Sequence, residues 1–372
     1  MHDVVLLGAG KIGRAIAKLL GHSGDYAVTV GDVDDRALAR LAGVPNTTTC
    51  HVDVSDPNAL RELLRGRAAV ISACSFAVNP GIARAALEAG VSYFDLTEDV
   101  ATTRITQQLA CEARKGQVFM PQCGLAPGFI AIAGNHLAKG FERLDEVRLR
   151  VGALAQFPTG ELKYNLTWST DGLINEYCNP CEVIHEGRKL EVLPLEGLEH
   201  FSLDGVDYEA FNTSGGIGTL WESLQGQVRN LDYKTVRYRG HRDLVAFLVN
   251  ELRLGSRRAI LKDILEHAVP GTLQDVVLVF CVVTGWRDGV FSQVSDARKI
   301  YHGEVFGEPW SAIQITTAAG ICAAVDLHRT GVLPSTGFIR QEQVDFDAFL
   351  ANRFGRYYNG HGHPVAPATS LA

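Results

Sequence analysis

Residues 4–20 read VVLLGAGKIGRAIAKLL, and they decide the fold of the N-terminal part of the chain. The apolar run VVLL is typical of a strand buried on both faces, and the residues after the last glycine have helical spacing. Between them, Gly8, Gly10 and Gly13 form G-x-G-x-x-G, and Asp32 ends a second strand-like segment 19 residues beyond Gly13. A glycine motif in this setting predicts a dinucleotide-binding βαβ unit.

The glycines and the acid have separate physical roles in this interpretation. Gly8 makes the tight turn, Gly10 lets the backbone approach the pyrophosphate, and Gly13 lets the helix contact the strand. The N–H groups at the start of the helix then receive the phosphates. The Asp32 carboxylate accepts from the ribose hydroxyls and repels a 2′-phosphate, so we expect NAD rather than NADP. The alternative is a Gly-rich turn that binds no ligand.

Strand-like and helix-like segments continue to alternate along the first third of the chain. The strand-like segments lie at 47–56, 68–79, 91–99 and 117–125. This alternation predicts an α/β domain with a Rossmann-type, doubly wound parallel sheet, and ligands of such sheets bind beyond the carboxyl ends of the strands. The loops at 74–79, 97–99 and 124–128 are therefore expected at one crevice, although 97–99 is described equally well as a plain connector.

Cofactor contacts are expected from these loops. Asn79 is a candidate for the nicotinamide ribose or amide, but a helix cap ahead of Pro80 competes with that role. The expected cofactor-binding set is Gly8, Gly10, Lys11, Ile12, Gly13, Asp32, Asp53, Val54, Ala73, Cys74, Ser75, Asn79 and Leu125.

After residue 129 the pattern changes. Strand-like segments with few helices between them lie at 143–154, 162–170, 189–195, 231–240, 279–289 and 291–303. They predict a second, α+β domain with a mostly antiparallel sheet over residues 129–304. An Ala-rich helix pattern at 309–331 is expected to return to the first domain, which we assign to 1–128 and about 305–350. The segment 355–372 has little to bury and is expected to be a flexible tail.

The bulk composition excludes several classes of protein. A formal charge of −7 and a pI near 6.0 do not favour a nucleic-acid binder. No apolar run reaches the roughly 18 residues that span a bilayer. The eight cysteines are scattered apart from Cys178 and Cys181, so we expect a cytoplasmic protein with reduced thiols and no metal. The histidines at 361 and 363 lack acidic or cysteine companions for a metal site.

Several motifs together resemble the saccharopine dehydrogenase superfamily. They are GAGKIG, GLAPG, YNLTWSTDGLINEY, FNTSGGIGTL and YKTVRYRGH, and the resemblance covers roughly residues 1–350. Within the superfamily the chain looks most like the NAD-dependent lysine 6-dehydrogenases. The resemblance implies a Rossmann domain paired with a sheet-containing domain for substrate binding and dimerisation, and hence a homo-oligomer, a dimer or higher.

Two departures from the saccharopine reductases favour a smaller amine substrate. Ala126 stands where the glutamate-forming enzymes typically carry Asp in a G-L-D-P-G loop. His241 stands where those relatives tend to have Phe. A single substitution is weak evidence for a substrate, but both substitutions indicate the lysine branch.

The resemblance implies oxidation of the ε-amine of L-lysine by NAD to allysine and ammonia, followed by cyclisation to Δ1-piperideine-6-carboxylate. An ε-ammonium has a pKa of about 10.4 and must be neutral before it can lose hydride, so the site needs a proton acceptor. Two alternatives remain. One is a dehydrogenase or reductase of a secondary amine, as in saccharopine or carboxynorspermidine metabolism, and the other is a non-catalytic NAD-binding scaffold.

The stretch 230–241, NLDYKTVRYRGH, supplies the leading substrate-site candidates. Arg237 is expected to hold the substrate carboxylate, with a structural ion pair to Glu176 or Asp171 as the alternative. His241 is expected to transfer a proton or order the attacking water, and the alternative is a structural imidazole.

The other candidates come from two further segments. Asp171 and Glu176 are alternatives for holding the ammonium end, and each can also be a helix-start acid or a surface charge. Tyr164 and Thr213 are ordinary sheet residues that could equally line a pocket. The expected substrate-binding set is Tyr164, Glu176, Thr213, Ser214, Gly215, Gly216, Arg237 and Tyr238, with His241 and Asp171 as catalytic residues.

Overall fold

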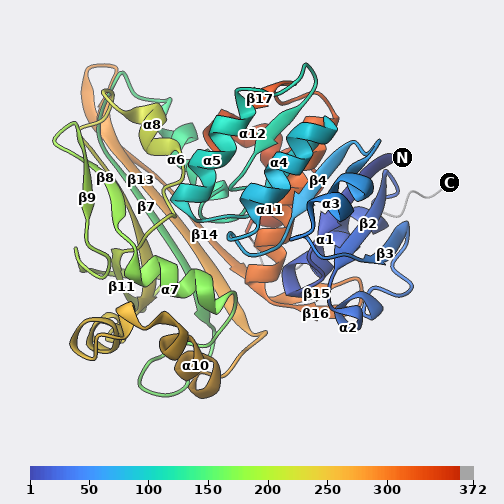
Figure 1. The fold of residues 1–372 in the computed structure, drawn as a ribbon. Coiled ribbons are helices and arrows are strands. Elements are labelled where there is room, and N and C mark those ends of the chain that lie inside the picture. The colour runs from blue at the N-terminus through green and yellow to red at the C-terminus, as the bar shows by residue number, and fades with distance from the viewer. Residues whose placement is uncertain (361–372) are drawn as a thin grey trace. The chain divides into compact units, whose positions relative to one another are not determined.

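The computed structural model describes residues 1–360, and the chain divides into two compact units (Figure 1). The first comprises residues 1–136, 218–220 and 317–356, and the second comprises 137–217, 221–316 and, of the described residues, 357–360. The chain returns to the first unit at Thr317, where the sequence led us to expect a return at about residue 305.

The first unit contains a seven-stranded, wholly parallel sheet in the order β17-β6-β5-β4-β1-β2-β3. The strand order reverses between β1 and β4, which defines the switch point of a doubly wound sheet. The predicted Rossmann-type sheet is thus confirmed, with β17 as an edge strand that the sequence pattern did not indicate. The strands are β1 (His2–Leu7), β2 (Tyr26–Asp32), β3 (Thr47–His51), β4 (Ala69–Ser72), β5 (Ser92–Asp95), β6 (Val118–Met120) and β17 (Gly337–Phe338).

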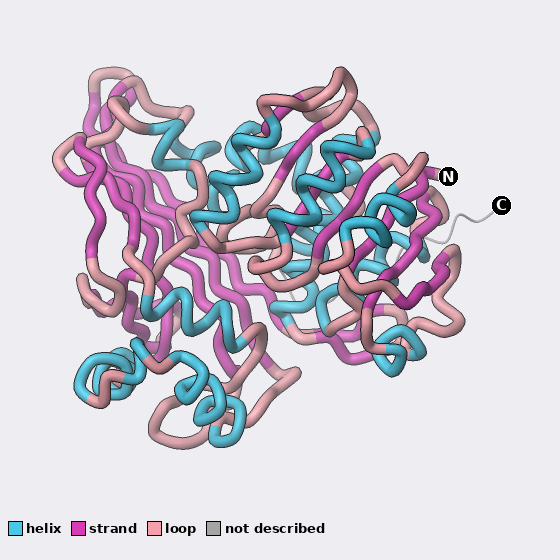
Figure 2. Tube along the Cα trace, viewed as in Figure 1, coloured by secondary structure: helices cyan, strands magenta, loops and turns pink. Residues whose placement is uncertain are grey.

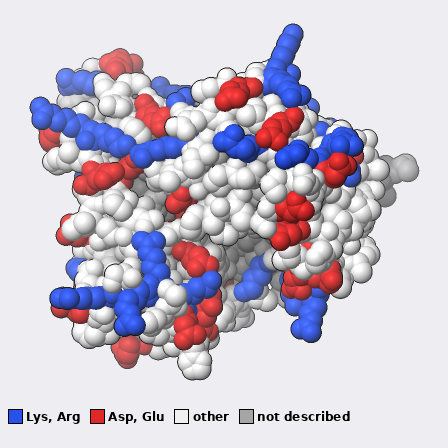
Figure 3. Space-filling model, in the orientation of Figure 1, with Lys and Arg blue, Asp and Glu red and all other residues white. Residues whose placement is uncertain are grey.

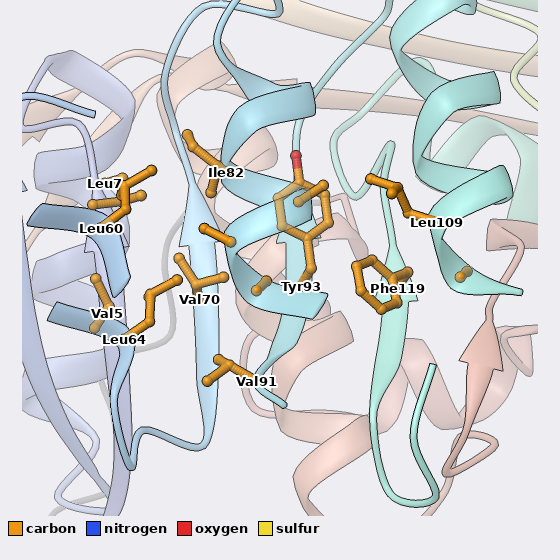
Figure 4. Packing of buried hydrophobic residues seen from close by; sticks show 14 of the residues in the cluster. Val5, Leu7, Leu60, Leu64, Val70, Ile82, Val91, Tyr93, Leu109 and Phe119 are labelled. Carbon is orange, nitrogen blue, oxygen red and sulfur yellow. The ribbon is translucent and has the colours of Figure 1, made fainter. Parts of the chain in front are cut away.

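Helices cover both faces of this sheet. On one face, α3, α4 and α5 pack against alternate strand residues, and Tyr93 and Phe119 lie in that core (Figure 4). Phe94, the next residue of β5, contacts the ring of His328 in α11 on the other face. The helices are α1 (Lys11–His22), α2 (Asp35–Ala39), α3 (Pro57–Leu64), α4 (Asn79–Ala89), α5 (Val100–Ala110), α6 (Phe129–Ala138), α11 (Ala312–Arg329), η3 (Gln341–Gln343) and α12 (Phe346–Ala351).

Side-chain caps set the starts of α2, α3, α5 and α12. Asp34, Asp56, Asp99 and Asp345 each accept a hydrogen bond from a backbone N–H of the following turn. Such a cap satisfies a donor that the helix leaves free and is worth about 1 kcal/mol. Helix α1 differs, because its N-cap is Gly10 and supplies no side-chain acceptor.

The second unit is built on a long mixed sheet, whose strands are magenta in Figure 2. Its strand order is β10-β11-β12-β7-β13-β14, and β8 and β9 extend from β12. Only β12 and β7 pair in parallel, so the predicted mostly antiparallel sheet is confirmed. The strands are β7 (Arg143–Ala155), β8 (Cys181–His185), β9 (Arg188–Val192), β10 (Glu199–Leu203), β11 (Val206–Asn212), β12 (Asn230–Tyr238), β13 (Asp275–Arg287) and β14 (Val290–Tyr301), with a separate pair β15 (Gly303–Val305) and β16 (Glu308–Trp310).

One predicted strand in this unit is wrong. Residues 162–170 form turns and irregular backbone, with a single bridge from Leu166 to Gly271, and helix α7 starts at Thr170. The alternation there reflects buried side chains of a loop that packs on α7 rather than strand pairing. The helices of the unit are α7 (Thr170–Cys178), α8 (Leu220–Leu224), α9 (His241–Ala246), the π-helix η1 (Phe247–Glu251), η2 (Leu254–Ser256), α10 (Arg258–Ala268) and η4 (Gly355–Tyr358).

The C-terminal segment departs from the expected tail at its start. Residues 355–358 form η4, a short 3-10 helix, and Tyr358 is fully buried, whereas residues 361–372, including both histidines at 361 and 363, lie outside the described residues. Within residues 1–360, no helix has the length and apolar character needed to cross a membrane.

Candidate functional site

The Gly-rich turn of the first unit is held by close backbone contacts. Gly8 has φ +98°, and a Cβ there would lie 2.8 Å from the carbonyl oxygen of Ala73. A Cβ at Gly13 would overlap the carbonyl oxygen of Gly8. Gly10 is exposed, with no atom within 4 Å of where its Cβ would be, so the turn leaves open space at the start of α1.

Asp32 joins this turn to the end of β2. Its Oδ2 accepts from the N–H of Ala9 at 2.6 Å, and its Oδ1 accepts from the N–H of Asp34 at 2.9 Å. The helix start has no side-chain cap, so it can receive an anion, and a carboxylate lies at the strand end where a ribose would be recognised. These features fit a dinucleotide.

Asn79 does not cap helix α4, the alternative role that the sequence suggested. Its side chain is buried, its Oδ1 accepts from Ser72 Oγ at 2.7 Å, and its Nδ2 lies 3.5 Å from Asp95 Oδ2. The N-cap of α4 is Val78. The amide is therefore bonded inside the unit, because the start of α4 turns it towards β4 and β5.

Asp95 is a residue that the sequence analysis missed. It is fully buried at the end of β5 and accepts from Tyr93 Oη at 2.6 Å and from the N–H groups of Thr97 and Gln122 at 2.9 Å. Burial raises the pKa of Asp95, and these hydrogen bonds oppose the rise. The carboxylate fixes two loops at the carboxyl edge of the sheet. The sequence feature that could have identified Asp95 is its position as the last residue of a predicted parallel strand.

The remaining predicted cofactor residues are spread around the same sheet edge. Lys11, Asp53 and Ser75 are exposed, Ile12, Val54, Ala73 and Cys74 are half-buried, and Leu125 is buried. Burial raises the pKa of Cys74 to about 11, so this thiol stays protonated. Hydrogen bonds from Ser55 lower the pKa of Asp53, which keeps it charged.

The second unit contains a buried polar cluster around Arg237, which is 2% exposed. Its Nε donates to Tyr177 Oη at 3.0 Å, and its Nη1 donates to Thr235 Oγ1 at 3.1 Å and to the Val236 carbonyl at 2.9 Å. The nearest acidic oxygen to Nη2 is Glu176 Oε2 at 3.9 Å, beyond hydrogen-bonding distance. Within residues 1–360, Nη2 donates no hydrogen bond, so its two N–H groups are available to a ligand.

His241 lies in this cluster with both ring nitrogens engaged. Its Nδ1 is 2.8 Å from the Leu162 carbonyl, and its Nε2 is 2.9 Å from Tyr177 Oη. Burial, and to a smaller extent the charge of Arg237, lowers the pKa of His241 to about 3. The imidazole is therefore neutral at physiological pH.

Five other buried polar atoms, in residues 164–175 and 213, have no hydrogen-bond partner among the described residues. Thr167 and Trp168 lie beside the Tyr164 phenol without reaching hydrogen-bond geometry. Buried polar groups are normally paired, so several such atoms in neighbouring segments of one unit point to a polar ligand. The atoms are Tyr164 Oη, Asn165 Oδ1, Thr167 Oγ1, Asn175 Nδ2 and Thr213 Oγ1.

The two candidate carboxylates separate in the structure. Glu176 is buried on α7 and faces Arg237. Asp171, in the first turn of the same helix, is about half exposed and lies 2.6 Å from Lys262 Nζ. The prediction of Asp171 as a catalytic residue is corrected, because it points from α7 to α10 and its charge is already balanced there.

Tyr238 also lies apart from the cluster. Its hydroxyl donates to the Ala155 carbonyl at 2.8 Å, and its ring stacks on Tyr208. The alternation of strand β12 places it on the face opposite Arg237, so its prediction as a substrate contact is corrected. Lys234, on that same opposite face, pairs with Glu199 at 2.9 Å. Arg239 follows the end of the strand and is half exposed.

The loop after β11 contributes less to the cluster than predicted. The Ser214 hydroxyl donates to the Pro180 carbonyl at 2.8 Å, so it ties two loops together instead of supporting a carboxylate. Gly215 has φ +87°, and a Cβ at Gly216 would overlap the ring of Tyr233. These glycines let the loop pass close to β12.

Tyr177 is the second residue that the sequence analysis missed, although it stands in the quoted motif next to Glu176. Its hydroxyl joins Arg237 to His241, and burial raises its pKa well above the usual range. Adjacent residues of a helix point in different directions, so the spacing gave no reason to expect Glu176 and Tyr177 around one guanidinium.

No group of three or more His, Cys, Asp and Glu side chains in residues 1–360 could hold a metal ion, and Cys178 and Cys181 are free thiols. On the face shown in Figure 3, basic and acidic side chains are interspersed.

Comparison with known proteins identifies the family. The model described as saccharopine dehydrogenase NADP binding domain matches residues 4–120, and the model described as saccharopine dehydrogenase C-terminal domain matches residues 124–354. The chain thus carries an NAD(P)-binding domain. A saccharopine dehydrogenase (NADP+, L-glutamate-forming) of Saccharomyces cerevisiae is 25% identical over 271 residues, which are 67% of this chain and 57% of that protein. The match spans little more than half the length of this relative.

One solved structure agrees closely with the fold. The apo saccharopine dehydrogenase (L-Glu forming) of Saccharomyces cerevisiae superposes with a TM-score of 0.78 at 16% identity, over 94% of this chain and 96% of that one. A myo-inositol dehydrogenase of Corynebacterium glutamicum has a TM-score of 0.45 at 12% identity, over 96% and 94% of the two chains, which is too low to bear on fold or function. Because the C-terminal family model alone covers more than half of its residues, this chain belongs to the saccharopine dehydrogenase family.

Proposed function

We propose that this protein is an NAD-dependent dehydrogenase that oxidises the ε-amine of L-lysine. The neutral amine loses hydride from C6, which the bound nicotinamide accepts, and water converts the resulting iminium to allysine and ammonia. The turn at 8–13 and Asp32 would hold the cofactor. The cluster around Arg237 would hold the amino acid.

The observation that carries the proposal is the buried guanidinium of Arg237 with Nη2 unbonded. Three hydrogen bonds hold Nε and Nη1 in place, so the remaining edge is presented in a fixed orientation. A buried cation with free donors is costly unless a ligand anion balances it. An α-carboxylate is the anion of matching size and geometry.

Glu176 extends this to an α-amino acid. Its Oε2 lies 3.9 Å from Arg237 Nη2, so both groups address the same end of a ligand. An extended lysine separates its α-carbon from Nζ by about 6 Å, so Glu176 cannot hold the ε-amine while Arg237 holds the carboxylate. We therefore assign Glu176 to the α-ammonium, in place of the ε-end role that the sequence suggested.

The preference for NAD rests on the acids around the end of β2. Asp32 is joined there by the exposed Asp34 and Asp35, and Asp53 follows β3. Arg36 and His51 are the basic residues of these segments, and His51 pairs with Asp35 at 3.0 Å. A 2′-phosphate would meet net negative charge, which supports NAD although the matching family model and the yeast relative are named for NADP.

A saccharopine-type secondary amine is the second candidate, and the family membership favours it. A spectrophotometric screen distinguishes the two, using NAD+ or NADP+ with lysine, ornithine, saccharopine and polyamines. Reduction of NAD+ by lysine alone, with one ammonia released per NADH, supports the lysine reaction. Turnover only with saccharopine, or only with a keto acid or semialdehyde present, would replace it. Cofactor binding without turnover of any amine would indicate a scaffold protein.

A further inference from the structure

We propose that His241 is a positioning residue, which acts through Tyr177 to orient the guanidinium of Arg237, and that it exchanges no proton with the substrate. The inference rests on the proposed role of Arg237 in binding a substrate carboxylate. It reverses the role in proton transfer that the sequence suggested for His241.

The hydrogen-bond partners determine the direction of every bond in this chain of contacts. A backbone carbonyl only accepts, so His241 must carry its proton on Nδ1 to bond Leu162 at 2.8 Å. In the neutral ring, which burial favours, Nε2 is an acceptor, and the Tyr177 hydroxyl donates to it at 2.9 Å. The Tyr177 oxygen is left to accept from Arg237 Nε at 3.0 Å, and a guanidinium can only donate. An imidazolium would instead make the Tyr177 oxygen accept from two cations, and within residues 1–360 it would leave the phenol proton without an acceptor.

The turn that carries His241 is itself held by a buried carboxylate. Gly240 has φ +96° and is the N-cap of α9, and its N–H donates to Glu209 Oε2 at 2.8 Å. The N–H of Arg242 donates to Glu209 Oε1 at 2.6 Å. Glu209 is 2% exposed and stands opposite Arg237 in the pairing of β11 and β12. Glu209 therefore holds the backbone on both sides of His241, and this fixes the position of the imidazole.

The groups that face His241 oppose a second proton on the ring. Arg237 of β12 brings a positive charge, Tyr177 of α7 is a neutral phenol held by burial, and Tyr164 brings a second phenol ring at 5.3 Å. The ring of Phe211 stacks on the other side. No carboxylate of these elements bonds the ring, so nothing stabilises an imidazolium that has accepted a substrate proton.

Three substitutions and one control separate positioning from proton transfer. His241→Gln keeps a neutral donor and acceptor but cannot take up a proton at neutral pH. His241→Phe keeps the ring volume and removes both hydrogen-bonding groups. Tyr177→Phe removes the hydroxyl that joins His241 to Arg237. His267→Gln is the control, because His267 is an exposed residue of α10 in the same unit.

The experiment measures steady-state kinetics with lysine and NAD+, lysine binding by calorimetry, and histidine ¹⁵N NMR of the whole protein. The His241 signals are those missing from the His241→Gln spectrum. We expect the Nδ1–H tautomer, with no titration between pH 5 and pH 8. Tyr177→Phe and His241→Phe should raise KM for lysine and its Kd about tenfold, the loss of one charge-assisted bond. His241→Gln should restore most of that loss, with kcat within about threefold of wild type.

Two results would overturn the assignment. One is an imidazole that titrates between pH 5 and pH 8, and the other is a His241→Gln enzyme with unchanged KM and a collapsed kcat, as for a lost general base. The proposed function fails differently, through a wild-type protein that reduces no NAD+ with lysine. In that case the NMR tautomer and the lysine Kd of Tyr177→Phe still decide the role of His241.

Discussion

Arg237 and Glu176 face each other inside the second unit, with 3.9 Å between Nη2 and Oε2. They come from β12 and α7, and both side chains are more than nine-tenths buried. The distance is short enough for mutual attraction and too long for a hydrogen bond. Arg237 Nη2 therefore keeps bonding capacity for a ligand carboxylate.

Arg237→Lys tests the carboxylate contact while keeping the charge. Lysine cannot present two parallel donors, so we expect KM for L-lysine to rise about thirtyfold, on the scale of one bond between charged groups. The Kd for NAD+ should stay within twofold or so of wild type, because the cofactor residues belong to the first unit. Arg239→Lys, on a half-exposed residue 3.6 Å from Asp207, is the matched control. An equal loss of lysine and NAD+ affinity would make Arg237 structural.

Glu176→Gln tests the α-ammonium contact by comparing two substrates. L-lysine carries an α-ammonium and 6-aminohexanoate does not, and both have the carboxylate and the distal amine. We expect KM for lysine to rise about tenfold and KM for 6-aminohexanoate to stay unchanged or fall, because a charged contact is lost only with lysine. Glu191→Gln on the exposed strand β9 is the control. Equal effects on both substrates would remove Glu176 from the α-end.

The pH profile tests the form of the amine that reacts. The substrate ε-amine has a pKa of about 10.4, and only its neutral form loses hydride. The forward rate at low lysine should therefore rise steeply from pH 7 to pH 10. The pKa of His241, about 3, puts its titration below this range. A flat profile over these pH values would contradict the amine reaction, and initial rates of NADH formation measure it.

Acid stability tests the buried imidazole without any substrate. The folded pKa of His241, about 3, lies below the ordinary value of 6.5, so between these values the unfolded chain binds a proton that the folded chain does not. The contribution of the neutral His241 imidazole to the free energy of unfolding is complete above pH 6.5 and is lost as the pH falls towards 3. Between pH 6 and pH 5, wild type should lose about 1 kcal/mol of unfolding free energy relative to His241→Gln. Urea titrations measure this difference, and parallel curves would contradict it.

Asp32→Ala tests cofactor choice. Removing the carboxylate at the end of β2 takes away the ribose acceptor and the charge that repels a 2′-phosphate. We expect the ratio of kcat/KM for NAD to that for NADP to fall by about a hundredfold, the sum of a lost charged bond and a relieved repulsion. Glu62→Ala, an exposed acid on α3 of the same unit, is the control. An unchanged ratio would place the specificity elsewhere.

The first unit could be predicted almost completely from local patterns. Buried parallel strands are continuous apolar runs, the glycines at 8, 10 and 13 are demanded by contacts within one βαβ unit, and Asp32 follows at a fixed distance. Strand β17 escaped prediction because two residues, Gly337 and Phe338, have no periodicity and become a strand only by pairing with β6.

The substrate cluster was predicted in part. The sequence alone determined that strand β12 carries Arg237 on the face opposite Lys234, since side-chain alternation is a local property. It indicated a polar segment at 164–176 but not which carboxylate of that segment turns inward. The same alternation applied to residues 162–170 predicted a strand that does not form, because strand formation needs a partner as well as a pattern.

Only the tertiary structure decided the chemistry of the cluster. Contacts between β12, α7 and the loop at Leu162 commit both nitrogens of His241, place Tyr177 between it and Arg237, and leave Asp171 at the surface with Lys262. The sequence determines which groups exist and which face of an element carries them. Their protonation and their partners depend on burial and on distances between segments far apart in the chain, and those are properties of the folded molecule alone.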